Sequence, residues 1–219
     1  MKPDINEWNI VIVGQWNPHI FSPKWMCEAL LGVKDIESEF AVGPMTGGMR
    51  YLTNHLIILP GQDRLIIGPR NTSDSTLKEA ENIAVRTLQL LQYTPVQAAG
   101  INFSFTESNP PPEVLTPFQL ADNNILADAG YSLSNTEIIR DIKLDQTILK
   151  LKMAHSDKGR LRLHFNFHHS LESASQAATV IKDKTLEYRD RAINLLVNSY
   201  HLTMDEEDNN GFGNPKNGK

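Results

Sequence analysis

The chain has 219 residues, of which 40% are hydrophobic and 21% are charged, and its formal net charge is −5. These proportions are ordinary for a soluble globular protein, and the acidic balance disfavours nucleic-acid binding, which usually needs a basic surplus. No apolar run approaches the ~20 residues that span a bilayer, and the opening residues lack the apolar core of a signal peptide. The single cysteine, Cys27, makes no internal disulfide. We therefore expect a cytoplasmic protein that does not enter a membrane.

The chain begins with a predicted strand at 9–16, which is rich in β-branched side chains. A short helix is expected next. Ser22 followed by Pro23 predicts its start, because the hydroxyl can cap a free amide and proline fits the first helical position. Gly32 predicts its end.

Three strands and a long helix complete the first half of the chain. The strands are predicted at 36–42, 49–59 and 63–68, with glycine- and proline-containing turns between them. Thr76 and Glu79 form a plausible capping box at the start of the long helix. Apolar side chains then recur at helical spacing until Tyr93.

The second half predicts the same order of elements. Residues 96–105 alternate between apolar and small or polar side chains, which indicates a half-buried strand. Thr116 and Pro117 repeat the cap-then-proline pattern that starts the first short helix. Three strands are expected at about 135–142, 145–154 and 160–168, and a long helix at about 171–198.

We therefore predict an α+β protein of two tandem β-α-β-β-β-α halves, about 8–94 and 96–200, within one domain spanning 1–202. The halves share one curved, mainly antiparallel sheet with the long helices on one face. The other possibility is that two ordinary α+β halves are alike by chance. The element order resembles the duplicated saddle of TATA-box-binding-protein-like domains, but no sequence motif of that family is present. Residues 203–219, acidic and then Asn/Gly-rich, are predicted to be a disordered tail.

The segment "RLHFNFHHS" at 162–170 holds three of the seven histidines. In a strand, His164, Asn166 and His168 share one face, while Phe165 and Phe167 share the other. Residues four apart along a strand lie roughly 13 Å apart, so two of these histidines cannot bind one zinc ion. We interpret the segment as a strand with phenylalanines in the core and histidines on the opposite face. A ligand-contacting polar patch is the alternative, and no metal or cofactor is predicted.

Three further side chains are ligand-contact candidates. His55 is expected in the middle of a strand, with Tyr51 and Thr53 on its face. Arg64 and Arg160 occupy corresponding places at the start of the last strand in each half, where a pseudo-two-fold axis could relate them. The alternative is that these arginines lie on edge strands and oppose aggregation.

No catalytic constellation is recognised, and a lone Cys27 is more often a small buried side chain than a nucleophile. We favour a non-enzymatic protein that binds another protein, or a second copy of itself, through the open sheet face. The second hypothesis is a small-molecule-binding protein or weak hydrolase whose pocket contains histidines. The third is a nucleic-acid accessory protein that uses a concave sheet.

Overall fold

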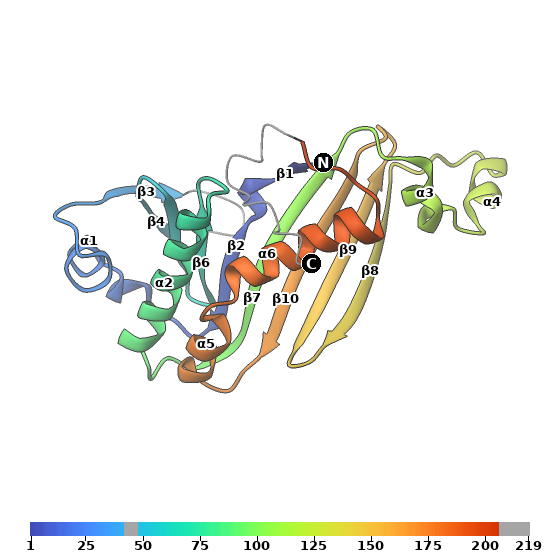
Figure 1. Cartoon of the computed structure of the whole chain (residues 1–219). Coiled ribbons are helices and arrows are strands. Elements are labelled where there is room, and N and C mark those ends of the chain that lie inside the picture. Colours follow the sequence, from blue (N-terminus) through green and yellow to red (C-terminus); the bar gives the residue numbers. More distant parts are fainter. Residues whose placement is uncertain (42–47, 206–219) are drawn as a thin grey trace.

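A computed structural model describes residues 1–41 and 48–205 of the chain. Ten strands form one mainly antiparallel sheet (Figure 1). The strands are β1 (Lys2–Pro3), β2 (Asn9–Gly14), β3 (Glu37–Ala41), β4 (Gly48–Leu52), β5 (Leu56–Pro60), β6 (Arg64–Pro69), β7 (Val96–Glu107), β8 (Asn135–Leu144), β9 (Thr147–Ser156) and β10 (Leu161–Ser170). The helices are η1 (Ile5–Glu7), η2 (Pro18–Ile20), α1 (Pro23–Trp25), η3 (Met26–Leu31), α2 (Asp74–Leu90), α3 (Pro112–Leu115), η4 (Thr116–Phe118), α4 (Asn123–Asp128), α5 (Ala174–Ile181), α6 (Thr185–Asn194) and η5 (Leu195–Ser199).

The strand order is β3-β4-β5-β6-β2-β7-β10-β9-β8, and the short β1 pairs with β7. The first strand of each half, β2 and β7, thus lie side by side at the centre, and the remaining strands extend outward from them. The two sides differ, because four strands lie beyond β2 and three beyond β7. The shared sheet is therefore confirmed, whereas an internal duplication stays a prediction.

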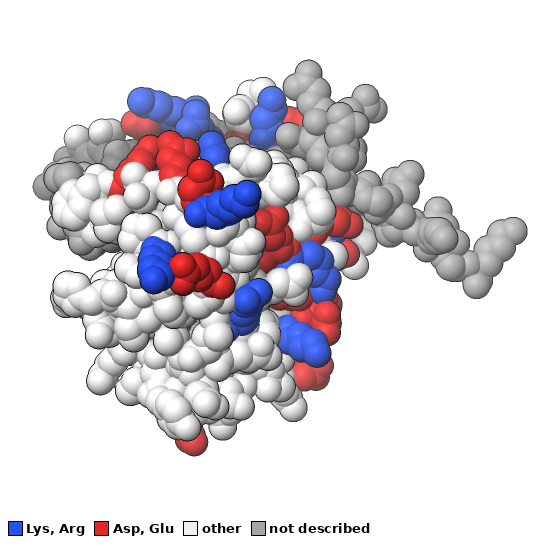
Figure 2. Space-filling model, turned by 90° about the vertical axis from the view of Figure 1, so that its left-hand side faces the viewer, with Lys and Arg blue, Asp and Glu red and all other residues white. Residues whose placement is uncertain are grey.

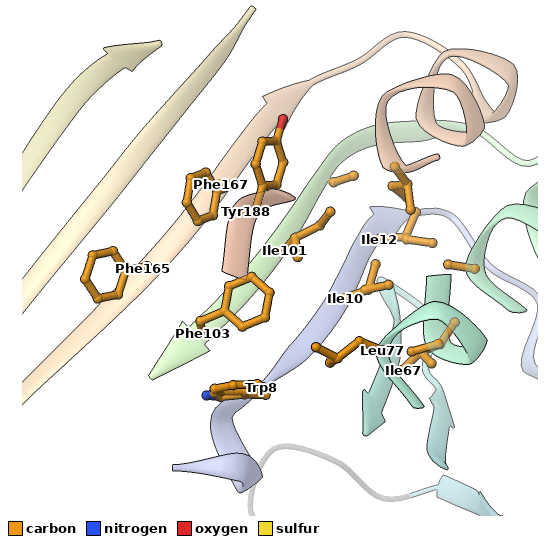
Figure 3. Close-up of a cluster of buried hydrophobic side chains, with 14 of the residues drawn as sticks. Trp8, Ile10, Ile12, Ile67, Leu77, Ile101, Phe103, Phe165, Phe167 and Tyr188 are labelled. Atoms are coloured by element: carbon orange, nitrogen blue, oxygen red, sulfur yellow. The ribbon is translucent and has the colours of Figure 1, made fainter. Parts of the chain in front are cut away.

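The helices α2, α5 and α6 cover one face of the sheet (Figure 1). Alternation along the central strands directs large apolar side chains toward these helices, and each contributes about 1.5–3 kcal/mol when fully buried. Phe167 of β10 stacks on Tyr188 of α6, with ring centroids 4.3 Å apart. Figure 3 shows this cluster, which includes Trp8, Ile10, Ile12, Ile67, Leu77, Ile101, Phe103 and Phe165.

Several predicted element boundaries are wrong for local reasons. The strand expected at 49–59 is a hairpin, β4 and β5, because the Thr53 hydroxyl accepts hydrogen bonds from the amides of His55 and Leu56. Such a side-chain-stabilised turn competes with an extended ladder. The helix cap before α2 is Ser73 instead of Thr76. By contrast, Ser22 caps α1 as predicted.

The long helix expected at 171–198 is also wrong, because it breaks between α5 and α6. Two backbone amides at the break, those of Asp183 and Thr185, donate to the buried carboxylate of Glu81 on α2, at 2.9 Å and 2.8 Å. A carboxylate that caps a helix N-terminus in this way stabilises the start of α6. Asp183 adopts a left-handed backbone conformation with φ of 61°.

The second short helix does not begin at Thr116. α3 starts earlier, at Pro112 after a run of prolines, and Thr116 opens the 3-10 turn η4 without a side-chain cap. No helix within 1–41 and 48–205 is long and apolar enough to cross a membrane. The tail predicted to be disordered falls mostly at 206–219, outside the described residues.

Candidate functional site on the open sheet face

The face of the sheet opposite α2, α5 and α6 is called here the open face. The short turn η1 lies over part of it. Glu7 of η1 contacts Arg162, 2.9 Å away on the open-face side of β10. Ile5 and Asn6 line a groove with Ile57, Leu59 and Ile66, which also point to this face. η1 is therefore a ridge between two different surfaces.

One of these surfaces is aliphatic. Cross-strand pairing places Val11 of β2 beside Ile66 of β6, and Ile66 beside Leu59 of β5. Leu52 of β4 pairs with Ile57 of β5. Together with Val13, these half-buried side chains are called the aliphatic patch: Val11, Val13, Leu52, Ile57, Leu59 and Ile66. A groove of about 240 Å³ runs between the patch and η1.

The other surface is a polar row that crosses five strands in register. Asn9, Asn102 and Asn166 are successive cross-strand partners on β2, β7 and β10. The row continues to Lys150 on β9 and Asp141 on β8, which form an ion pair. Asn166 donates to the Asn102 side-chain oxygen, and Asn102 donates to that of Asn9 at 2.8 Å.

Gly100 of β7 makes room for this row. A Cβ atom at Gly100 would lie 2.8 Å from Nδ2 of Asn166 and 3.7 Å from Nδ2 of Asn102. The carboxamides therefore lie in space that any other residue type at position 100 would fill. The same choice of glycine leaves the strand without a side chain at this point of the open face.

His164 lies next to the polar row and shares a 2.6 Å hydrogen bond with the hydroxyl of Ser104. Burial lowers the pKa of His164, with smaller effects from the charges of Glu7, Arg162 and Lys152. The Ser104 hydroxyl is fully buried, so it cannot attack a substrate from outside. The pair does not fit a hydrolase, because a nucleophile must reach its substrate.

Several cations on the open face are paired with carboxylates. Lys152 lies 2.8 Å from Glu137, and both line a groove of about 240 Å³ with Arg162, Glu7 and His164. Arg50 pairs with Glu39, and Arg64 pairs with Asp63. Figure 2 shows the same mixture of signs on the upper part of an adjoining side, whose lower part has little charge. Neutralised cations offer little to a phosphate backbone, which disfavours the nucleic-acid hypothesis.

The predicted candidates are only partly brought together. His164, Asn166 and His168 share the open-face side of β10, as the alternation predicts. Burial lowers the pKa of His168, and Lys150 lowers it further. His55 lies in the β4–β5 turn and contacts Glu79 of α2 at 2.8 Å. Four strand spacings separate β5 from β10, which is about 19 Å. His55 therefore does not lie close enough to His164, Asn166 and His168 to form one site with them.

Arg64 and Arg160 lie at opposite ends of the sheet. Arg64 pairs with Val13, Val13 with Ala98, and Ala98 with Ser170 at the far end of β10. Arg160 precedes the other end of that strand. Their strands, β6 and β10, are interior, so the expectation of edge-strand arginines is wrong. Cys27 is buried.

The sequence did not predict a cluster of three polar side chains, Thr147, His169 and Tyr188, on the covered face of the sheet. The hydroxyl of Thr147 lies 2.7 Å from Nε2 of His169, and the Tyr188 hydroxyl lies 3.1 Å from both groups. Burial lowers the pKa of His169. The three side chains line a pocket of about 340 Å³ together with residues of the β8–β9 turn, α5 and α6, and with Lys184 between the two helices. Alternation from Phe167 to His169 was the only sequence signal for this placement.

Metal chemistry has no donor set among the described residues, where no three His, Cys, Asp or Glu side chains are grouped to hold an ion. The chain matches no protein-family model. A search of curated proteins gives no match either.

Proposed function

We propose that this protein is a non-enzymatic interaction protein that binds a segment of another protein on the aliphatic patch. The observation that carries the proposal is a contiguous set of aliphatic side chains on the sheet face that α2, α5 and α6 leave free. When a partner covers apolar surface of this kind and removes it from water, the burial favours the complex by roughly 25 cal/mol per Å² of apolar area.

The composition of the patch supports a partner that presents aliphatic side chains. The patch residues carry no polar groups, and the charges at its ends, Arg50 and Arg64, are paired with their own carboxylates. A highly charged segment would lose hydration there without gaining a partner. The groove beside η1, lined by Ile5, Leu59 and Ile66, adds a concave place for an apolar side chain.

Site-specific photo-crosslinking in the native cells tests this proposal. A benzoylphenylalanine at position 59 should crosslink one identifiable protein, because its side chain lies inside the patch. The same residue placed at Gln89, exposed on α2, is the matched control and should not crosslink that protein. Adding Ile66→Lys to the position-59 protein should remove the crosslink, because it places an ammonium group inside the apolar contact.

Equal crosslinking from position 89, or persistence of the product with Ile66→Lys, would contradict the proposal. Circular dichroism of each variant shows whether the fold is intact. A crosslink to a second copy of the chain would identify the partner as the protein itself.

The pocket around His169 supports a second candidate function, binding of a small polar molecule. The pocket has Thr147, His169 and Tyr188 along its wall, with Lys184 and Glu187 also lining it. Pockets with a few convergent polar groups are the usual place for small ligands. A thermal-shift screen of polar metabolites against the wild type and His169→Gln tests it. Stabilisation that His169→Gln does not reduce would argue against this pocket.

A further inference from the structure

The two edges of the sheet are unequal. β3 forms one edge and has five residues, whereas β8 forms the other and has ten. β8 pairs with β9 in one unbroken register from Asn135 to Leu144, without a bulge. It contains no proline, and Ile139 is 66% exposed. Among the described helices, η4 packs against β8.

Such an edge presents unpaired backbone N–H and C=O groups along about 34 Å of strand. Proteins usually shorten, bend or cover an edge of this length, because it is a template for pairing with another chain. The edge of β8 is therefore a candidate surface for pairing with another chain, separate from the aliphatic patch.

We propose that β8 pairs antiparallel with β8 of a second copy of this chain, so that the two sheets continue across a two-fold axis. This inference does not depend on the proposed function, because it uses the sheet edge instead of the open face. Pairing residues 136–144 of both copies would form about eight to ten inter-strand hydrogen bonds.

The side chains of β8 select a second copy as the occupant. When Arg140 lies on the two-fold axis, Glu137 of each copy faces Lys143 of the other. Glu137, which also lies 2.8 Å from Lys152 of its own chain, would then bridge two cations, once in each copy. Ile138 faces Ile142 on the helix-covered side, again twice, and these two side chains already pack at the margin of the core. Opposite charges and apolar pairs directly across a ladder stabilise antiparallel strands.

Neighbouring registers are less favourable. Moving the axis to Ile139 places Glu137 opposite Asp141 twice, and moving it to Asp141 places that carboxylate opposite itself. Like charges across a ladder are destabilising. The cost of the favoured register is that Arg140 faces its own copy and that Ile139 faces Asp141 twice. Replacing Arg140 should therefore strengthen the dimer in this register.

Charge reversal tests the register directly. In Lys143→Glu, a glutamate at 137 faces a glutamate at 143 at each end of the paired strands. In Glu137→Lys, a lysine faces a lysine at the same two places. Each variant alone should therefore be monomeric. An equimolar mixture restores opposite charges at both ends and should give a heterodimer. Light scattering across a concentration series should give twice the 24.6 kDa chain mass for the wild type and for the mixture.

Lys24→Glu on α1 is the matched control, because it makes the same charge change on an exposed residue outside β8. It should dimerise like the wild type. Arg140→Thr should lower the dimer dissociation constant. Hydrogen exchange should slow in β8 as protein concentration rises.

A wild type that stays monomeric at every concentration would overturn the proposal. Dimers that survive either single charge reversal would also overturn it, as would a dimer without slower exchange in β8. Failure here leaves the open-face proposal untouched, because the crosslinking from position 59 reports on a different surface.

Discussion

The two faces of β10 show how one strand can serve two purposes. Phe165 and Phe167 point to the covered face and are fully buried against the helices. His164, Asn166 and His168 alternate with them on the open face, where they are only partly buried. On the covered face, burial and close packing restrict the choice of residue. On the open face, hydrogen bonds between side chains of neighbouring strands determine the arrangement.

The largest expected effect comes from breaking the covered face. Phe165→Ala should lower the free energy of unfolding by about 3–5 kcal/mol, because it removes a buried ring and leaves a cavity. Urea unfolding measures the change. His168→Ala, on the opposite face of the same strand, is the control and should change the free energy by about 0.5 kcal/mol or less. Similar losses for both variants would contradict the distinction between the faces.

A smaller effect is expected where the open face is tightly packed. Gly100→Ala should cost about 1–3 kcal/mol, because the new Cβ displaces the Asn166 carboxamide. Gly68→Ala is the matched control, since its Cβ would lie 3.5 Å from the Trp8 carbonyl oxygen, an ordinary contact. Adding Asn166→Ala to Gly100→Ala should recover part of the loss in an unfolding experiment. No recovery would show that the polar row is not the cause.

The buried histidines on both faces of the sheet should make the stability of the fold depend on pH. Burial lowers the pKa of His164 and of His169 in the folded protein, so below the unfolded pKa of ~6.5 the unfolded chain binds more protons. Stability should therefore be full above that pH and decrease as the pH falls toward the folded pKa values. Unfolding measured at about pH 7.5 and about pH 5.5 should show a smaller loss for His169→Gln than for the wild type.

Glu81 adds a separate loss at lower pH. Burial alone would raise the pKa of Glu81, but hydrogen bonds from Thr185, Lys78 and Asp183 hold it below its usual value. Its contribution is present above the unfolded pKa of ~4.3 and is lost as the pH falls through the folded value. For the histidine experiment described before, an equal pH dependence of unfolding in His169→Gln and in the wild type would mean that His169 does not contribute to it.

The smallest stability effect is expected in the aliphatic patch. Leu59→Thr should change the free energy of unfolding by about 1 kcal/mol or less, because Leu59 is only half-buried on the open face. The same substitution should nevertheless abolish the crosslink to a partner from a probe at position 57. A large loss of stability would place Leu59 in the core of the fold instead of in a binding surface.

Much of the fold could be predicted from local patterns. Alternation in β7 and β10 identified which side chains enter the core, and Ser22 with Pro23 located α1. In each case, the residues that carry the pattern lie in the predicted element itself or directly before it. The turn at Thr53 was missed because its hydroxyl caps two amides inside an otherwise continuous β pattern.

Features that depend on distant partners could not be predicted. The break between α5 and α6 is fixed by Glu81, about a hundred positions away from Thr185 along the chain. The aliphatic patch draws residues from four strands, and its continuity follows from the strand order instead of from any single segment. His55 was placed wrongly for the same reason, because its environment comes from Glu79 on another element.

The unequal lengths of the two sheet edges bear on solubility. In the dimer proposed above, pairing of the two β8 edges about a two-fold axis would consume both of them, so growth would stop at two copies. What remains outward is β3, whose five residues include Glu37 and Glu39. A short strand with two glutamates is a poor template for further addition, so the sheet of such a dimer would not readily extend into a fibre.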